Sequence, residues 1–83
     1  MEIPYHLLRT TTAREMVAAL LRDGFVFRRQ KGSHHRYNHP DGRRVTVAFS
    51  NATDTFRVKT LQAMIEKQAR WTGSDLHRLR LLD

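Results

Sequence analysis

Five histidines are the side chains of this 83-residue sequence best suited to acid–base chemistry. Histidine is the residue whose unperturbed pKa lies near neutral pH, so it can take up and release protons under ordinary conditions. His34, His35 and His39 lie close together, whereas His6 and His77 are isolated and are expected to be ordinary surface residues. The chain has no cysteine, which excludes a disulfide framework, a thiolate metal site and a cysteine nucleophile.

Basic residues surround the three clustered histidines. The segment 28–44 contains six of them against one acidic residue, so it carries five of the seven net positive charges of the chain. Such a concentration of charge attracts polyanions before any specific contact forms. It fits a nucleic acid, and equally an anionic lipid surface, an acidic protein or a merely solvated face. The six are Arg28, Arg29, Lys31, Arg36, Arg43 and Arg44.

These residue types meet the requirements of RNA cleavage by attack of the RNA's own 2′-hydroxyl group. That reaction needs a proton acceptor that works near neutral pH and cations that stabilise the charge building on the phosphorane. Beside His34, Gly32 leaves the backbone unobstructed, and Ser33 offers a hydroxyl or nearby amides to a phosphate. Without other information, a histidine on a strand is more often a plain surface residue. The candidate cations are Arg29, Lys31, Arg43 and Arg44.

A metal site built from the three clustered histidines is the alternative. Neighbouring residues on a strand point to opposite faces, which separates His34 from His35. No cysteine or acidic residue completes a ligand set with the usual spacing. The sequence therefore favours a site without a metal or other cofactor.

The elements that must position these residues follow from the periodicity of the chain. A capping box from Thr12 to Glu15 and apolar residues at helical spacing predict a helix over Thr11–Asp23. A strand then begins at Phe25 and turns basic at Arg28 and Arg29. Two further strands are predicted, joined by a type I turn with a glycine bulge. They run over roughly Ser33–Asn38 and Arg43–Phe49, and the turn is His39–Gly42.

The rest of the chain returns to helical spacing. A second helix is predicted over roughly Thr55–Arg70. A short last helix follows, which Ser74 or Asp75 could cap, with Leu76, Leu79 and Leu82 on one stripe. Aromatic residues at alternate strand positions and beside a helix end are typical of a core, although they could also stack on bases. We place Phe25, Phe27 and Trp71 in the core.

This order predicts a single α+β domain over residues 1–83, with the α-β-β-β-α arrangement of the double-stranded-RNA-binding-domain class and a short C-terminal helix. Helices on one face of the antiparallel sheet would leave the other face open. No apolar run approaches the roughly 18 residues that span a bilayer, and residues 1–10 lack the features of a secretory signal. We expect a soluble, cytoplasmic protein that does not bind a membrane.

Strand alternation separates the two adjacent histidines. His34 shares one face with Arg36 and Asn38, whereas His35 shares the other with Tyr37. Because the tyrosine is the large amphipathic member, its face is expected to meet the helices. His34 would then stand on the open face, unless a bulge near the turn disturbs the alternation.

Three motifs in order resemble the HicA toxin family. They are the glycine–aromatic pair Gly24-Phe25, the turn Arg29-Gln30-Lys31-Gly32-Ser33-His34, and the hairpin Pro40-Asp41-Gly42-Arg43. With the flanking helices, the resemblance covers roughly Thr11 to Leu82 and leaves residues 1–10 outside as an N-terminal extension. It implies an endoribonuclease that cleaves mRNA without a metal and is inhibited by a HicB-like antitoxin.

The resemblance also implies roles for single residues. The family's glycine–serine–histidine falls on Gly32, Ser33 and His34, which makes His34 the expected catalytic residue. The expected RNA-binding residues around it are Arg28, Arg29, Lys31, Gly32, Ser33, Arg36, Arg43 and Arg44.

The sequence departs from the family pattern after the third strand. Relatives usually carry a proline and a basic residue or histidine where this chain has Ala48-Phe49-Ser50-Asn51, and the glycine–threonine that opens their second helix reads Lys59-Thr60. Fewer phosphate contacts or altered antitoxin docking could follow. Two rival hypotheses therefore stand: a non-catalytic RNA-binding module of the same fold, and a scaffold whose basic face only binds an acidic partner.

Overall fold

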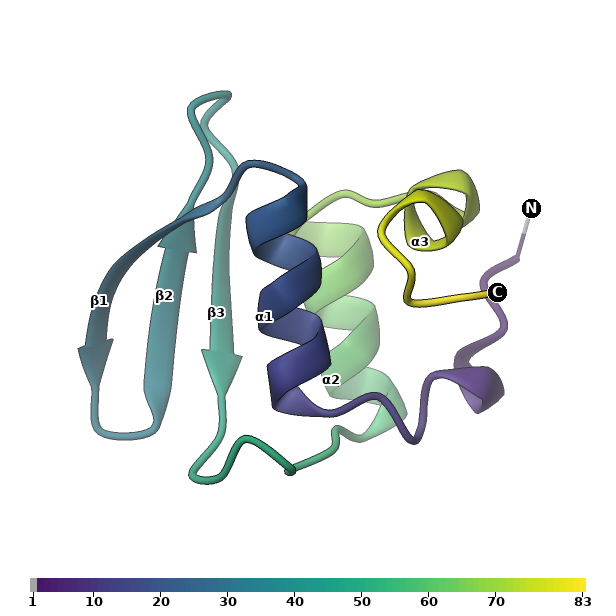
Figure 1. The fold of residues 1–83 in the computed structure, drawn as a ribbon, viewed down its shortest axis with the longest axis horizontal. Helices are drawn as coiled ribbons and strands as arrows, with labels where there is room; N and C mark the ends of the chain where they lie inside the picture. Colours follow the sequence, from purple (N-terminus) through teal and green to yellow (C-terminus); the bar gives the residue numbers. More distant parts are fainter. Residues whose placement is uncertain (1) are drawn as a thin grey trace.

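The computed structural model describes residues 2–83, and its order of elements confirms the predicted α+β arrangement (Figure 1). Three antiparallel strands form one sheet in the order β1-β2-β3. Along the chain, helices precede and follow these strands. The elements are η1 (Tyr5–Leu7), α1 (Ala13–Arg22), β1 (Val26–Lys31), β2 (His34–Asn38), β3 (Arg44–Ala48), α2 (Val58–Gln62), the π-helical continuation η2 (Ala63–Gln68) and α3 (Gly73–Arg78).

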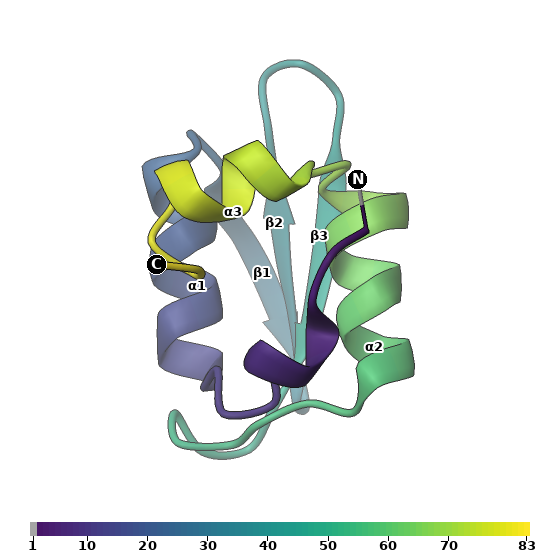
Figure 2. The same cartoon turned by 90° about the vertical axis from the view of Figure 1, so that its right-hand side faces the viewer.

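The helices all lie on one side of the sheet. α1 and α2 run side by side against this face of the sheet, and α3 and the N-terminal segment cross on the far side of this helix pair, nearest to the viewer in Figure 2. The opposite face of the sheet carries no element of the described chain, as the sequence predicts. We call it the open face. No helix among residues 2–83 has the length and apolar character needed to cross a bilayer.

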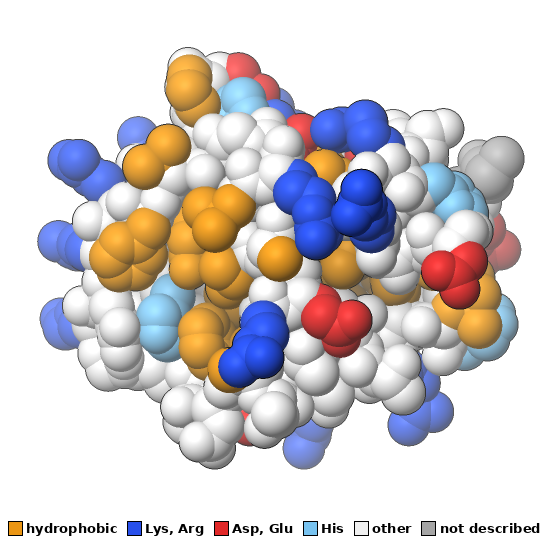
Figure 3. Space-filling model, viewed as in Figure 1, with side chains coloured by type: hydrophobic (Ala, Val, Ile, Leu, Met, Phe, Trp, Pro, Cys, Tyr) orange, Lys and Arg blue, Asp and Glu red, His pale blue; other side chains and the backbone are white. Residues whose placement is uncertain are grey.

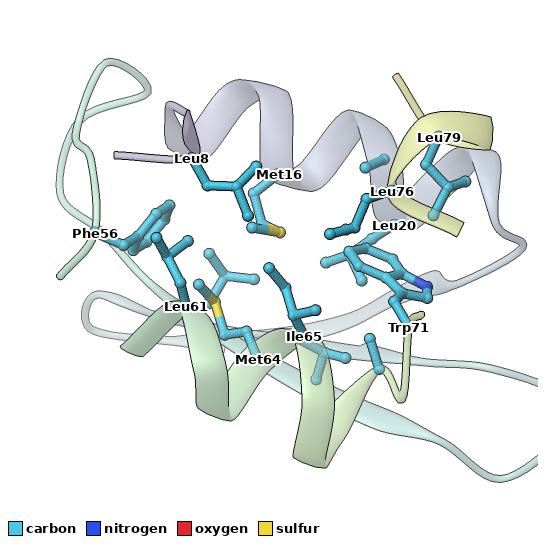
Figure 4. Packing of buried hydrophobic residues seen from close by; sticks show 14 of the residues in the cluster. Leu8, Met16, Leu20, Phe56, Leu61, Met64, Ile65, Trp71, Leu76 and Leu79 are labelled. Carbon is cyan, nitrogen blue, oxygen red and sulfur yellow. The ribbon is translucent and has the colours of Figure 1, made fainter. Parts of the chain in front are cut away.

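The core lies between the covered face of the sheet and the helices (Figure 4). Tyr37, Val45 and Val47 contribute from the strands, and Leu61 and Ile65 meet them from α2 and η2. Each is at most 6% exposed. Segments at both ends complete this core with Leu8, Leu76, Leu79 and Leu82.

A capping box fixes the start of α1, and a glycine turn follows its end. The Thr12 hydroxyl accepts the Glu15 N–H and the Glu15 carboxylate accepts the Thr12 N–H, which confirms the predicted capping box. After the helix, Gly24 adopts φ +101°, and a Cβ there would lie 3.0 Å from Nε2 of His39. Only glycine therefore permits both this turn and the close approach of the His39 ring.

One turn and one β-bulge set the strand register. The His39 N–H donates to the Arg43 carbonyl and the Gly42 N–H to the His39 carbonyl, with Gly42 at φ +100°, so the predicted hairpin turn is confirmed. The pairing of β1 with β2 is interrupted between Phe27 and Arg29 by a β-bulge at Arg28.

Several predicted details were wrong. The second helix begins at Val58 rather than Thr55, and its second half is π-helical. The last helix is capped by the Thr72 hydroxyl, with Asp75 as the reciprocal partner, so neither Ser74 nor Asp75 is the cap.

The three aromatic residues predicted to lie in the core differ in burial, and the prediction was wrong for Phe27. Phe25 and Trp71 are buried as predicted, at 2% and 3% exposed. Phe27 is 49% exposed, because the helices do not extend over the β1 edge of the sheet. Its ring packs edge-on against Tyr37, with the ring centroids 5.6 Å apart.

Candidate nucleic-acid interface

The open face gathers His34 and most of the predicted cations. Within β2, His34 and Arg36 are exposed and Asn38 is half-buried, while the alternate residues His35 and Tyr37 turn towards the helices. Register pairs each open-face residue of β2 with one of β3: His34 with Ala48, Arg36 with Thr46, and Asn38 with Arg44. Strand alternation thus places His34 where the sequence predicts it.

The bulge in β1 raises the charge of this face. Phe27 lies opposite Tyr37, and the next paired residue is Arg29, opposite Arg36. The extra residue, Arg28, lies between them, and both arginines line the same hollow on the open face. A regular strand would have sent these two neighbours to opposite faces.

A first hollow surrounds His34, and we call it the His34 hollow. It lies at the end of the sheet where β1 turns into β2, since Lys31 pairs with His34 there. Its lining combines one histidine with three cationic side chains. The lining residues are Arg29, Lys31, His34, Arg36 and Thr46.

A second hollow, the Asn38 hollow, lies further along the same face. It shares Arg29 and Arg36 with the first, so the two hollows are neighbours on this face. Its single uncharged residue is Asn38, whose Oδ1 is buried and accepts no hydrogen bond within residues 2–83. The lining residues are Arg28, Arg29, Arg36, Asn38 and Arg44.

Within the described range, residues 2–83, no acidic side chain lines either hollow. The ion pairs formed among residues 2–83 involve Arg43, Arg78 and His39, and none includes a cation of the open face. Figure 3 shows Lys and Arg side chains along the margin of the molecule beyond the strands. Their charge is available to an external anion.

His35 occupies a different environment from His34. Its Nδ1 lies 3.0 Å from the Ser33 carbonyl oxygen and 3.3 Å from that of Val47. Carbonyls only accept, so Nδ1 carries the proton in these contacts. The ring also stacks on Phe49, with centroids 3.9 Å apart and an interplanar angle of 11°. These contacts fix His35 as part of the sheet's covered side.

The turn before His34 is held by its backbone. Gly32 has φ +58°, and a Cβ on it would meet no atom within 4 Å, so conformation rather than space explains this glycine. Ser33 is half-buried, and its carbonyl accepts the N–H of Phe49 at 2.9 Å. The first residue after β3 thereby ties the end of that strand to the turn that carries His34.

Arg43 is the one predicted RNA-binding cation that the structure does not bring to this face. Its guanidinium donates to Asp41 at 2.7 Å, to Asp23 at 3.0 Å and to the Ala69 carbonyl at 2.6 Å. It also lies 4.9 Å above the Phe25 ring centroid. Arg43 therefore joins the β2–β3 hairpin to the ends of the helices.

Asp23 is the centre of these contacts, which we call the Asp23 junction. Its side chain is 9% exposed and accepts hydrogen bonds from Arg43, Arg78 and Nε1 of Trp71. Its backbone carbonyl accepts from Nε2 of His39 at 2.8 Å. Burial alone would raise the pKa of Asp23, but the three donors outweigh it and hold the pKa below the usual aspartate value.

Sequence reasoning missed Asn38 and Thr46 as members of the site. Alternation already placed Asn38 on the face of His34 and Arg36, so that signal could have found it. Thr46 follows from the register of β3 against β2, which the sequence does not specify. Within residues 2–83, no three histidine or acidic side chains gather as a potential metal site.

Fold and site together define a small α+β domain of the double-stranded-RNA-binding type whose bare sheet face carries a histidine among unpaired cations. A family sequence model described as "HicA toxin of bacterial toxin-antitoxin" matches residues 13–71. The chain therefore belongs to the HicA toxin family, which implies an mRNA interferase function and an antitoxin partner. No curated protein matches it. The N-terminal segment and α3 lie outside the matched range although both contribute to the core.

Proposed function

We propose that this protein is an endoribonuclease toxin that cleaves mRNA with His34 as its catalytic residue and without a metal ion. The observation that supports this best is the His34 hollow, in which an exposed histidine stands beside Arg29, Lys31 and Arg36 with no acidic residue in the lining. A base and several cations on one accessible surface are the groups that phosphodiester cleavage needs.

The reaction follows from these groups. His34 takes the proton of a ribose 2′-hydroxyl, whose oxygen attacks the adjacent phosphorus. The bond from phosphorus to the 5′ oxygen then breaks, and solvent at this exposed face supplies the proton that the leaving oxygen takes up. Arg29, Lys31 and Arg36 stabilise the negative charge on the phosphorane.

The remaining cations extend the proposed RNA-binding surface beyond His34. Arg28 and Arg44 line the Asn38 hollow, which neighbours the His34 hollow and shares Arg29 and Arg36 with it. Single-stranded RNA can therefore lie along the open face, with one phosphate at His34 and others at the more distant arginines. We leave Arg43 out of this set because its donors are used inside the protein.

A HicB-like antitoxin is the proposed inhibitor. An acidic antitoxin surface would neutralise the open face and cover His34. The two sheet edges offer it unequal access: the Thr46 N–H at the β3 edge is occupied by the Gln68 side chain at 2.8 Å, whereas β1 pairs only with β2 and exposes Val26 and Phe27. An antitoxin that supplies a strand would add it to β1.

The decisive experiment compares His34→Gln with His35→Gln. His34→Gln is expected to lower RNA cleavage by about a hundredfold or more, as loss of a general base does, with RNA affinity and Tm kept. His35→Gln should keep appreciable cleavage but lose about 1 kcal/mol of stability, because it removes contacts to Ser33 and Phe49. The reverse pattern would contradict the assignment of His34.

Induced expression in a bacterium separates the rival functions. Growth arrest that His34→Gln abolishes supports the nuclease. Arrest that persists in this variant would instead indicate a module that sequesters RNA, and no arrest would leave a scaffold for an acidic partner. Masking is tested on the purified toxin–antitoxin complex, which should not cleave RNA; a complex that cleaves as fast as the free toxin would contradict it.

A further inference from the structure

His34 stands at one end of the open face. It is the first residue of β2, and its partners in register are the last residue of β1, Lys31, and the last residue of β3, Ala48. No strand among residues 2–83 continues the open face beyond this row. This end of the sheet borders the β1–β2 turn and the loop after β3, and the His39–Gly42 hairpin lies at the opposite end (Figure 1).

The cations extend from His34 in one direction. Arg29 and Arg36 form a pair two residues along β2 from His34, and Arg44 lies opposite the position four residues along. Four residues of a strand span roughly 13 Å, which exceeds the spacing of neighbouring phosphates in a nucleic acid strand. These exposed arginines can therefore hold more than one phosphate. All such phosphates would lie on the same side of the phosphate at His34.

The chain beyond His34 offers no comparable contacts to a phosphate. The segment 48–56 contains no lysine or arginine and has one acidic residue, Asp54. The backbone N–H groups of Ser50 and Asn51 donate to the Asp54 carboxylate at 2.9 and 3.0 Å, so these donors are used within the loop. The charge of this carboxylate also repels a phosphate.

The basic residues that border this loop belong to the other side of the sheet. Arg14 contacts the loop through its backbone N–H, which donates to the Ala52 carbonyl at 3.0 Å, but it is a residue of α1. Arg57 is the N-cap residue of α2. Both helices cover the opposite face of the sheet (Figure 2). The open face thus has cations on one side of His34 and an acidic loop on the other.

We propose that the protein holds RNA on one side of the scissile phosphate only. This inference rests on the proposed function, since it takes RNA as the substrate and His34 as the catalytic residue. After cleavage, one fragment stays on the arginines, whereas the other has no binding residue and leaves. The protein can therefore cut bonds close to one end of an RNA strand. Close to the other end, too few phosphates remain to reach Arg44.

The test measures where a short homopolymeric RNA is cut. Oligouridylate and oligoadenylate, labelled at the 5′ or the 3′ end, are digested so briefly that each molecule is cut at most once, and the rate at each bond is read from the fragment lengths. A homopolymer removes the effect of base preference within the strand. Bonds near one end should be cut as fast as internal bonds. Bonds near the other end should be cut about tenfold more slowly, the effect of losing one charge-assisted contact.

Arg44→Gln tests which residues cause this contrast between the ends. It removes the arginine farthest along the sheet from His34, so internal bonds should be cut more slowly while bonds near the disfavoured end keep their rate. The contrast should therefore fall. Arg78→Gln is the matched control, because it removes an equal charge at the Asp23 junction and should keep the contrast. His34→Gln should slow cutting at every bond.

Equal rates towards both ends, or an equal slowing towards both, would overturn the inference. A contrast that Arg44→Gln leaves unchanged, or that Arg78→Gln reduces as much, would also overturn it. The proposed function fails separately if His34→Gln cuts as fast as the parent protein. If the parent protein cuts neither homopolymer, the proposed function fails and this inference fails with it.

Discussion

Two groups of arginines in this molecule differ in their partners rather than in their chemistry. On the open face, Arg29, Arg36 and Arg44 line hollows that contain no acidic residue. At the Asp23 junction, Arg43 and Arg78 are paired with carboxylates at 2.7 to 3.0 Å. The contrast is sharpest between Arg43 and Arg44, which are neighbours in the chain.

This difference separates stability from function. A paired, half-buried guanidinium joins elements of the fold, and removing it leaves a carboxylate without its partner. An unpaired guanidinium on an exposed strand contributes little to stability but contributes charge to binding. The two groups should therefore respond to mutation in opposite ways.

The largest effect is expected for Asp23→Asn. It removes the one carboxylate shared by Arg43, Arg78 and Trp71, so it should lower the free energy of unfolding by about 3 kcal/mol. For a domain of this size that corresponds to a fall in Tm of about 10–20 °C, measured by thermal denaturation. RNA affinity of the folded variant should not fall. A Tm within a few degrees of the parent protein would show that the junction does not stabilise the fold.

The next largest effects on stability and RNA binding are expected for the chain neighbours Arg43 and Arg44. Arg43→Ala should cost about 2 kcal/mol of stability and leave the salt dependence of RNA binding unchanged. Arg44→Ala should change stability by less than about 0.5 kcal/mol and weaken binding. Denaturant unfolding and fluorescence anisotropy on the same two variants measure both quantities. If Arg43→Ala altered binding and Arg44→Ala altered stability, the division between the groups would be wrong.

The pH dependence of stability also distinguishes the groups. Because the pKa of Asp23 is lowered in the folded state, its contribution is present above the ordinary aspartate pKa and is lost as the pH falls through its folded value. Tm should therefore drop between about pH 5 and pH 2, and less steeply in Asp23→Asn. Asp54→Asn is the control, since the pKa of Asp54 is lowered by backbone N–H donors of its own loop. This variant should also reduce the fall in Tm at low pH, but it should leave the contribution of Asp23 in place.

The smallest expected effect concerns the number of phosphate contacts. Arg36→Gln should reduce the slope of log affinity against log salt by about 0.7, the value for one contact to a single strand. Arg78→Gln, which removes an equal charge from the Asp23 junction, should leave the slope unchanged. Equal reductions in both variants would mean that net charge, rather than position on the open face, governs binding.

Much of this arrangement was predictable because it follows from local rules. The capping box at Thr12, the glycine turn at Gly42 and the alternation of His34 and His35 each depend on residues a few positions apart. The open-face position of His34 followed from one further inference, that Tyr37 faces the helices. The catalytic role given to His34 stays a prediction.

Details that depend on distant partners were not predictable. Arg43 was grouped with the other basic residues because nothing in its neighbourhood points to Asp23, which lies 20 positions away. The bulge at Arg28 carries no glycine to mark it, and Phe27 was placed in the core because the sequence does not say how far the helices extend over the sheet. The Thr72 cap was missed because Thr72, Ser74 and Asp75 lie within four positions and each could have served as the cap.

The β1 bulge has a consequence for how such a face can evolve. Residues 28–31 deliver three cations to it, where a regular strand of that length delivers two side chains. Deleting Arg28 would restore regular pairing, with Phe27 still opposite Tyr37 and Arg29 still opposite Arg36. The affinity of this face for an anionic polymer can thus be raised or lowered by inserting or deleting one residue in β1, with no substitution in the core.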